Sequence, residues 1–324
     1  VKIDVKAARE QYAAAMDDSC PEHVRMAAFC GLLGLSQRDM DKLIADGLSR
    51  DSAVWRGTVA SFTANLPAKS LRRINVKFMR SLPAAGRAAL IEAFIAAGAR
   101  SGAPFLRAAL KNSDDFPAMI AAAGGLGDLG DASDSDTLID LLSHQKEVLA
   151  DAARMSLIKL KDPKTDARVV RALSKRKGEA DAHVRLLGVT AFRKPAKAAP
   201  AALPYLDAAE PAVRAAALTA LTEIADKKQL PQIFAAACKA ADPQERRAAE
   251  KALAVLARKY PDAATAAARP LLATATAAGR RALLTALGIA GTPDGLALVI
   301  ETLGDADSGV ADDALRVLAG WHAV

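Results

Sequence analysis

The sequence has few aromatic residues, no long uncharged apolar run and no strand-like alternation. Phe, Trp and Tyr make up only 4% of its 324 residues, which argues against a large aromatic-lined ligand pocket. Hydrophobic residues make up 52% of the chain, but they form no uncharged run of about 18 residues, so we expect no membrane insertion. We predict an all-α, soluble protein. Its compartment is unknown from the sequence, and we expect it to be cytoplasmic or, if Val1 is a processed N-terminus, periplasmic or secreted.

Cysteine is also scarce, and the three cysteines do not form a disulfide framework. Cys20 and Cys30 fall on one predicted helix, about 15 Å apart at 1.5 Å per residue, which is too far for a disulfide. Together with His23 they provide three ligands, whereas a structural zinc site needs four. We therefore interpret Cys20, Cys30 and Cys238 as free thiols and predict no metal.

One stretch, clearest at residues 211–224, recurs about ten times along the chain. Read as a helix, it places Val213, Ala217 and Leu221 on one face. Aligned on Val213, the copies follow one another at intervals of 29 to 35 residues. This regularity predicts a repeat architecture. The aligned positions, called anchors below, are Val24, Trp55, Gly86, Ala118, Leu149, Val184, Val213, Glu245, Gly279 and Val310.

Each copy carries the same pattern of residue types after its anchor. A small or apolar residue follows at four positions, and a large apolar residue follows at eight positions in nine of the ten copies. A shorter apolar helix and a turn with Asp, Ser or Pro precede each copy, so each unit is a helical hairpin that must stack on its neighbours. Seven copies place Arg directly after the anchor: Arg25, Arg56, Arg87, Arg185, Arg214, Arg246 and Arg280.

The chain resembles a HEAT-repeat protein of the short bacterial, PBS-lyase-like type. The resemblance rests on units of about 30 residues, Asp or Asp-Pro in the turn, and Val-Arg-x-x-Ala-x-x-x-Leu in the second helix. It implies a single domain over 1–324, folded as a right-handed, armadillo-like α-solenoid of about ten hairpins whose second helices line a concave face. It also implies that the arginine column is a structural ladder. The carboxylates expected to bond it are Asp18, Asp51, Glu210 and Asp242.

Catalysis and cofactor binding find little support in the residues. The four histidines fall in four different repeats, and no nucleophile elbow or clustered acid–base pair is present. Residues 125–130 read Gly-Leu-Gly-Asp-Leu-Gly, but they end a helix in repeat register instead of following a strand. We predict that the chain is not an enzyme and binds no cofactor.

Basic residues cluster in two segments, and the net charge is +7. One segment lies in the third hairpin, and the other surrounds an extended loop at residues 174–181, which makes both of them candidate contacts for an acidic or phosphate-bearing partner. The acidic segment 114–140 is interpreted as helix capping. The candidate partner- or anion-binding residues are Lys69, Arg72, Arg73, Lys77, Arg168, Arg171, Lys175, Arg176, Lys177, Arg193 and Lys194.

We favour a non-enzymatic interaction scaffold that binds a protein partner on the concave face or the basic loop, because solenoids of this kind commonly do so. One alternative is a nucleic-acid-binding solenoid that uses the basic segments 69–87 and 168–197. Another is an accessory repeat module of a larger enzyme.

Overall fold

The computed structural model describes residues 4–17, 19–35, 39–67, 70–74, 76–111, 115–175 and 179–321. The side chains of Arg72, Arg73 and Val76 are not described. Within these ranges every regular element is a helix. The elements are α1 (Val5–Ala14), α2 (Glu22–Leu35), α3 (Met40–Leu48), α4 (Ala53–Ala64), η1 (Ser70–Arg73), α5 (Val76–Ser81), α6 (Ala84–Ala96), η2 (Arg100–Gly102), α7 (Ala103–Ala109), α8 (Phe116–Leu129), η3 (Ala132–Asp134), α9 (Ser135–Leu141), α10 (Glu147–Lys159), α11 (Pro163–Lys175), α12 (Ala180–Arg193), α13 (Ala199–Ala202), η4 (Leu203–Asp207), α14 (Pro211–Ile224), α15 (Leu230–Ala237), α16 (Pro243–Lys259), α17 (Pro261–Leu272), α18 (Ala277–Ala290), α19 (Pro293–Thr302) and α20 (Ser308–Ala319).

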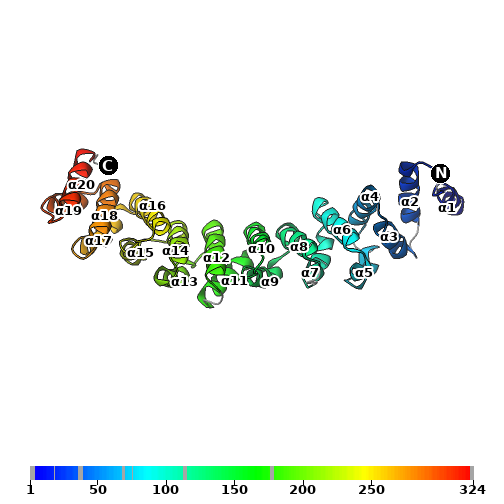
Figure 1. Ribbon diagram of the computed structural model, residues 1–324, viewed down its shortest axis with the longest axis horizontal. Coiled ribbons are helices and arrows are strands. Elements are labelled where there is room, and N and C mark those ends of the chain that lie inside the picture. The colour runs from blue at the N-terminus through cyan, green and yellow to red at the C-terminus, as the bar shows by residue number, and fades with distance from the viewer. Residues whose placement is uncertain are drawn as a thin grey trace. The chain divides into compact units, whose positions relative to one another are not determined.

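The described helices pair into ten consecutive hairpins, so the predicted all-α solenoid of about ten hairpins is confirmed. The chain divides into two compact units, residues 1–138 with 146–161, and residues 139–145 with 162–324. Within each unit the second helices of the hairpins (even-numbered) lie in one layer, and from α3 onward the first helices lie in the other (Figure 1). A single domain over 1–324 stays a prediction.

Side-chain caps mark where five of the second helices begin. Ser52, Asp115, Asp242, Thr276 and Asp307 each accept a hydrogen bond from the backbone N–H of the anchor three residues later. The anchor is consequently the third residue of the helix, as it is in nine of the ten second helices. Such caps satisfy N–H groups that have no partner inside the helix.

The repeated columns form the hydrophobic core. The leucines eight residues after the anchor are at most 1% exposed in five of the copies, namely Leu126, Leu157, Leu221, Leu253 and Leu287. Buried leucines at this spacing point to the same side of successive second helices. The column therefore repeats one buried contact position from hairpin to hairpin, as expected of a solenoid.

The sixth hairpin requires a correction to the predicted register. The third residue of α12 is Ala182, which is buried, whereas the predicted anchor Val184 lies two residues later. In the predicted register Phe192 would be a core residue, but its side chain is 68% exposed. Anchored on Ala182, the column places Leu186 in the core, and the ladder position after the anchor is His183 instead of Arg185.

The Gly-x-Gly-x-x-Gly stretch lies at the C-terminal end of α8, as its repeat register predicts. A Cβ on Gly127 would stand 2.8 Å from Cα of Ser156 in α10. The hydroxyl of Ser156 donates to the carbonyls of Ala123 (2.5 Å) and Gly124 (2.9 Å) in α8. Gly127 is therefore required for the close approach of two second helices.

Candidate binding surfaces

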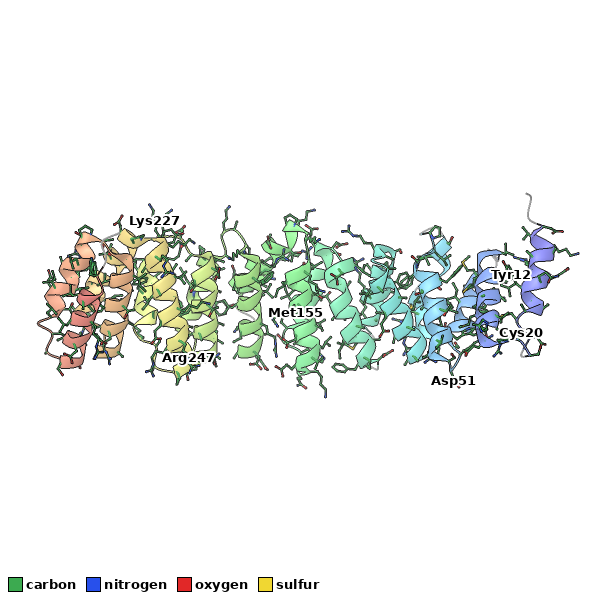
Figure 2. The ribbon with its side chains drawn as sticks, turned by 90° about the horizontal axis from the view of Figure 1, so that it is seen from above. Tyr12, Cys20, Asp51, Met155, Lys227 and Arg247 are labelled. Atoms are coloured by element: carbon green, nitrogen blue, oxygen red, sulfur yellow. The ribbon has the colours of Figure 1, made fainter. Side chains whose placement is uncertain are left out.

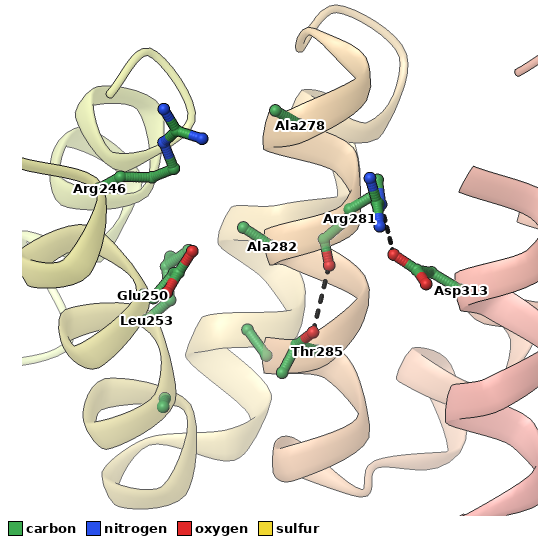
Figure 3. Close-up of a pocket in the computed structure, with 10 residues that line it drawn as sticks. Arg246, Glu250, Leu253, Ala278, Arg281, Ala282, Thr285 and Asp313 are labelled. Carbon is green, nitrogen blue, oxygen red and sulfur yellow. Dashed lines mark hydrogen bonds and ion pairs between the residues drawn. The ribbon is translucent and has the colours of Figure 1, made fainter. Parts of the chain in front are cut away.

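A groove of about 410 Å³ lies between the second helices α16 and α18 (Figure 3). Arg246, Glu250 and Leu253 form its α16 wall at intervals of four and three residues. Ala278 and Ala282 form the facing wall on α18. Residues at these intervals occupy one stripe of a helix, so two stripes face each other along the groove.

The floor of the groove is apolar, and the side chains on its α18 wall are short. Leu253 is 1% exposed and Ala286 is 2% exposed. The α18 wall consists of alanine side chains until Thr285, whose hydroxyl donates to the Arg281 carbonyl at 3.2 Å. A polar rim around an apolar floor is typical of surfaces that bind proteins.

The rim charges on the α20 side neutralise one another. Arg281 Nε donates to Asp313 Oδ2 (Figure 3). Arg316 Nη1 donates to Asp313 Oδ1 at 2.7 Å. The hydrogen bond from Arg281 lowers the pKa of Asp313 below its usual value, and the same bond raises the pKa of Arg281. Both groups are therefore charged at neutral pH and paired.

The rim charges on α16 have no such pairing. Arg246 Nη2 donates to the carbonyl of Ala241, 2.9 Å away in the preceding turn. Glu250 has neither a hydrogen bond nor an ion pair to any of the residues that the structure describes. Both side chains are exposed, and the Glu250 carboxylate points across the groove toward Ala282 (Figure 3). The groove thus offers one positive and one negative group, one helical turn apart.

A second cavity, of about 450 Å³, lies on the other layer between η4 and α15. Leu206, Ala235 and Ala236 contribute apolar surface, and Asp207 and Lys239 contribute charges. It provides a comparison site on the first helices of the same unit.

The basic residues of the sixth hairpin divide into two groups. Arg168, Arg171 and Lys175 lie on one face of α11 at intervals of three and four, and Arg171 and Lys175 are exposed. The candidate residues Arg176 and Lys177 lie outside the described residues.

Arg193 and Lys194, by contrast, make packing contacts, the first within the sixth hairpin and the second to the next hairpin. Arg193 Nε donates to Asp166 Oδ1 on α11 at 2.6 Å, and the arginine side chain is only 8% exposed. Lys194 pairs with Glu223 on α14 at 2.7 Å, and this contact lowers the pKa of Glu223. We therefore correct the expectation for Arg193, which belongs to the α11–α12 packing and not to an exposed basic surface.

The basic segment of the third hairpin is only partly described. Lys69 and the side chains of Arg72 and Arg73 lie outside the described residues, while Lys77 is exposed on α5. Arg87 is half-buried on α6 and donates to Asp115. Lys77, whose side chain is described, does not line the groove.

The arginine column makes two kinds of contact. Arg87, Arg214 and Arg280 pair with acids near the start of the next second helix, Asp115 (2.7 Å), Glu245 (2.7 Å) and Asp305 (2.9 Å). Five of the arginines also donate to a carbonyl five or six residues before them. These are Arg56, Arg87, Arg214, Arg246 and Arg280.

The carboxylates that the resemblance implied are different from those found. Asp18 lies outside the described residues. Arg87, Arg214 and Arg280 pair with Asp115, Glu245 and Asp305 in place of Asp51, Glu210 and Asp242. Arg185 is off the ladder position and donates to the Leu142 carbonyl at 3.1 Å. A ladder role for the whole column stays a prediction.

An ion-pair cluster that the sequence did not predict joins the fourth hairpin to the start of the fifth. Arg107 of α7 donates to Asp134 (2.6 Å) and Asp131 (3.0 Å), and these two aspartates also form the capping box of η3. Arg107 lies outside the repeated columns, so the signal available was the excess of aspartate over lysine and arginine in this segment.

The described ranges contain neither a membrane-spanning helix nor a cluster of metal ligands. None of the helices there combines the length and apolarity needed to cross a bilayer. Over those same residues, no three His, Cys, Asp or Glu side chains group as a metal ion requires. Cys20, Cys30 and Cys238 are free, and burial raises the pKa of the Cys238 thiol to about 11.

No protein-family model matches the sequence, and no curated protein matches it significantly. Solved structures of the karyopherin Kap121p are similar in fold. Kap121p bound to the extreme C-terminus of the protein phosphatase Cdc14p matches with a TM-score of 0.57 at 12% identity, over 100% of this chain and 42% of that chain. Kap121p bound to Nup53p matches with a TM-score of 0.56 at 12% identity, over the same shares. A substituted variant of Kap121p gives 0.58 at 13% identity, again over 100% and 42%.

This chain therefore spans less than half the length of the karyopherin chains that it matches. At 12–13% identity the likeness shows the fold alone, a HEAT-like α-solenoid. The short bacterial subtype of the repeat stays a prediction.

Proposed function

We propose that this chain is a non-enzymatic scaffold that binds a protein partner on the face of its second helices, in the groove between α16 and α18. The observation that carries the proposal is the groove itself, with its floor of Leu253 and Ala286 and its charged rim. An apolar centre surrounded by polar groups suits a protein segment. Kap121p, which is similar in fold, is bound to a protein in two of the matched structures.

A nucleic-acid partner finds less support in the side chains. Binding to a phosphate backbone depends on several exposed cations that act together. In the segment 168–197, Arg193 is buried against Asp166, and Lys194 is paired with Glu223. The exposed cations Arg171 and Lys175 of α11 line neither of the two cavities described above.

Filling the groove tests the proposal. Ala282→Trp would insert a large side chain from the α18 wall, and Ala235→Trp, in the cavity of the other layer, is the matched control. The tagged full-length proteins are used to capture partners from an extract of the source cells after nuclease treatment, and the captured proteins are quantified by mass spectrometry.

We expect at least one protein to be captured by the wild-type chain and by Ala235→Trp, and to be depleted about tenfold or more with Ala282→Trp. Circular dichroism checks that both variants are folded. If Ala282→Trp captures the same proteins in the same amounts, the groove is not the binding surface.

A further inference from the structure

We propose that the groove between α16 and α18 binds an amphipathic helix that presents, along one stripe, an acidic, a basic and an apolar residue in that order. The acidic residue lies over Arg246, the basic residue over Glu250 and the apolar residue over the floor near Ala254. This inference rests on the proposed function and adds to it the chemistry of the partner.

The first step is that Arg246 and Glu250 do not satisfy each other. They are four residues apart on α16, which is a spacing that permits an ion pair on a helix. With arginine N-terminal to glutamate, the pair has the less favourable order for that spacing. In the structure Arg246 bonds the Ala241 carbonyl, and no ion pair joins it to Glu250. Both charges therefore remain available to a partner.

The second step is the order of surfaces along the groove. From the start of α16 the wall reads Arg246, Glu250, then Leu253 and Ala254, which is positive, negative and apolar. Four residues of helix cover about 6 Å. A partner helix that lies along the groove covers the same distance between positions i and i+4, so the two charge pairs form together. Its next residue on the stripe, at i+7, reaches the apolar end.

The third step is the choice of a helix over an extended segment. The floor offers Leu253, Ala282 and Ala286, which have no side-chain hydrogen-bonding groups. An extended peptide that settled there would bury N–H and C=O groups without partners, at a considerable cost. A helix satisfies these groups internally, and its ridge of side chains packs between the two neighbouring helices. The alanine wall allows this close approach.

The fourth step excludes a simple acidic peptide. Arg281 and Arg316 both donate hydrogen bonds to Asp313. Neither the Asp313 carboxylate nor Arg281 is therefore an unpaired charge that could bind a peptide in the groove. A peptide with only acidic residues would bring a second negative charge to Glu250, and like charges at this range repel. The central residue of the partner stripe must therefore be basic.

The experiment uses two labelled peptides of identical composition. Both are alanine-rich helices of about 20 residues. One carries Glu, Lys and Leu at positions i, i+4 and i+7, and the other carries Lys, Glu and Leu. The comparison applies to a peptide that runs parallel to α16, because only in that direction does the leucine at i+7 reach the apolar end of the groove near Ala254. Binding to the full-length protein is measured by fluorescence anisotropy at low and at high salt.

We expect the Glu-Lys-Leu peptide to bind about tenfold more tightly, because two attractive exposed pairs replace two repulsive ones. The double variant Arg246→Glu, Glu250→Arg keeps the net charge and should prefer the Lys-Glu-Leu peptide. This inversion cannot come from a difference in helicity between the peptides. Arg247→Glu, next to the groove on α16, is the control and should keep the wild-type preference (Figure 2 labels Arg247).

Equal affinity for both peptides, or an unchanged preference in the double variant, would overturn the charge order. No binding of either peptide would overturn the helical occupant. In both cases the proposed function is judged separately, by the loss or retention of captured protein in Ala282→Trp.

Discussion

The pair of Arg214 and Glu245 allows the cost of breaking one contact between hairpins to be predicted. Arg214 Nε and Nη2 donate to the two carboxylate oxygens of Glu245 at 2.8 and 2.7 Å. Its Nη1 donates to the carbonyls of Ala208 and Ala209, both at 2.8 Å. The Glu245 side chain is only 4% exposed. The variant Arg214→Met would leave this carboxylate buried without a cation.

Removing one partner of a buried ion pair costs about 3 to 5 kcal/mol. Arg214 is itself 24% exposed, so water reaches part of the site and the lower end of this range applies. We expect a loss of about 3 kcal/mol in the free energy of unfolding. For a unit of this size, that corresponds to a fall of about 6 to 12 °C in the melting temperature.

Thermal and urea unfolding, followed by far-ultraviolet circular dichroism, would measure this loss. Arg281→Met is the control, because its pair with Asp313 is half exposed and exposed pairs contribute little. The double variant Arg214→Met, Glu245→Leu removes the buried charge and should recover most of the lost stability. If Arg214→Met and Arg281→Met lower the melting temperature equally, burial of the carboxylate does not determine the cost.

Three further predictions concern packing, pH and thiol reactivity. Gly127→Ala should destabilise by about 1 to 3 kcal/mol because its Cβ meets α10 backbone at 2.8 Å, whereas Gly124→Ala, with open space around it, should be neutral or stabilising in urea unfolding. Hydrogen bonds from a neighbouring serine lower the pKa of Asp131. The stability that the Asp131 carboxylate contributes is therefore present above its pKa of about 4 in the unfolded chain, and it is lost as the pH falls through the lower pKa of the native state. Asp131→Asn should thus destabilise at about pH 6 and match the wild type at about pH 2, and a pH-independent difference would contradict this. The buried Cys238 should react with a thiol reagent at pH 8 only on unfolding, while the half-exposed Cys20 reacts in the native protein; equal rates would refute the predicted order.

The repeat pattern was sufficient to predict the architecture because the same physical requirement recurs in every hairpin. A residue such as Leu126 must be buried against the next hairpin, and its spacing from the helix start is fixed by the Asp115 cap. The pattern misled in the sixth hairpin because Val184 and Arg185 imitate the usual anchor and arginine two residues late. With Ala182 as anchor, the irregular intervals of 35 and 29 become 33 and 31.

The groove, in contrast, could not be predicted from the columns. Glu250 and Arg281 stand five and two residues after their anchors, at positions that hold an apolar or small residue in most copies, so the columns do not predict a charge at either position. Whether two second helices leave a groove depends on how closely their side chains pack, and this varies from pair to pair. The acids that pair with the arginine column were also missed, because Asp115 and Glu245 hold different positions relative to their helix starts.

The contacts between hairpins have a consequence for how this chain acquires its structure. The hydrogen bonds named above between hairpins join residues that are 24 to 43 positions apart in the sequence. This separation is about a tenth of the chain length. Contacts of such short range require little loop closure, and they favour rapid folding. Each hairpin finds its partner in the segment synthesised immediately before it. The native order can therefore grow behind the ribosome, one repeat after another, without waiting for distant parts of the sequence.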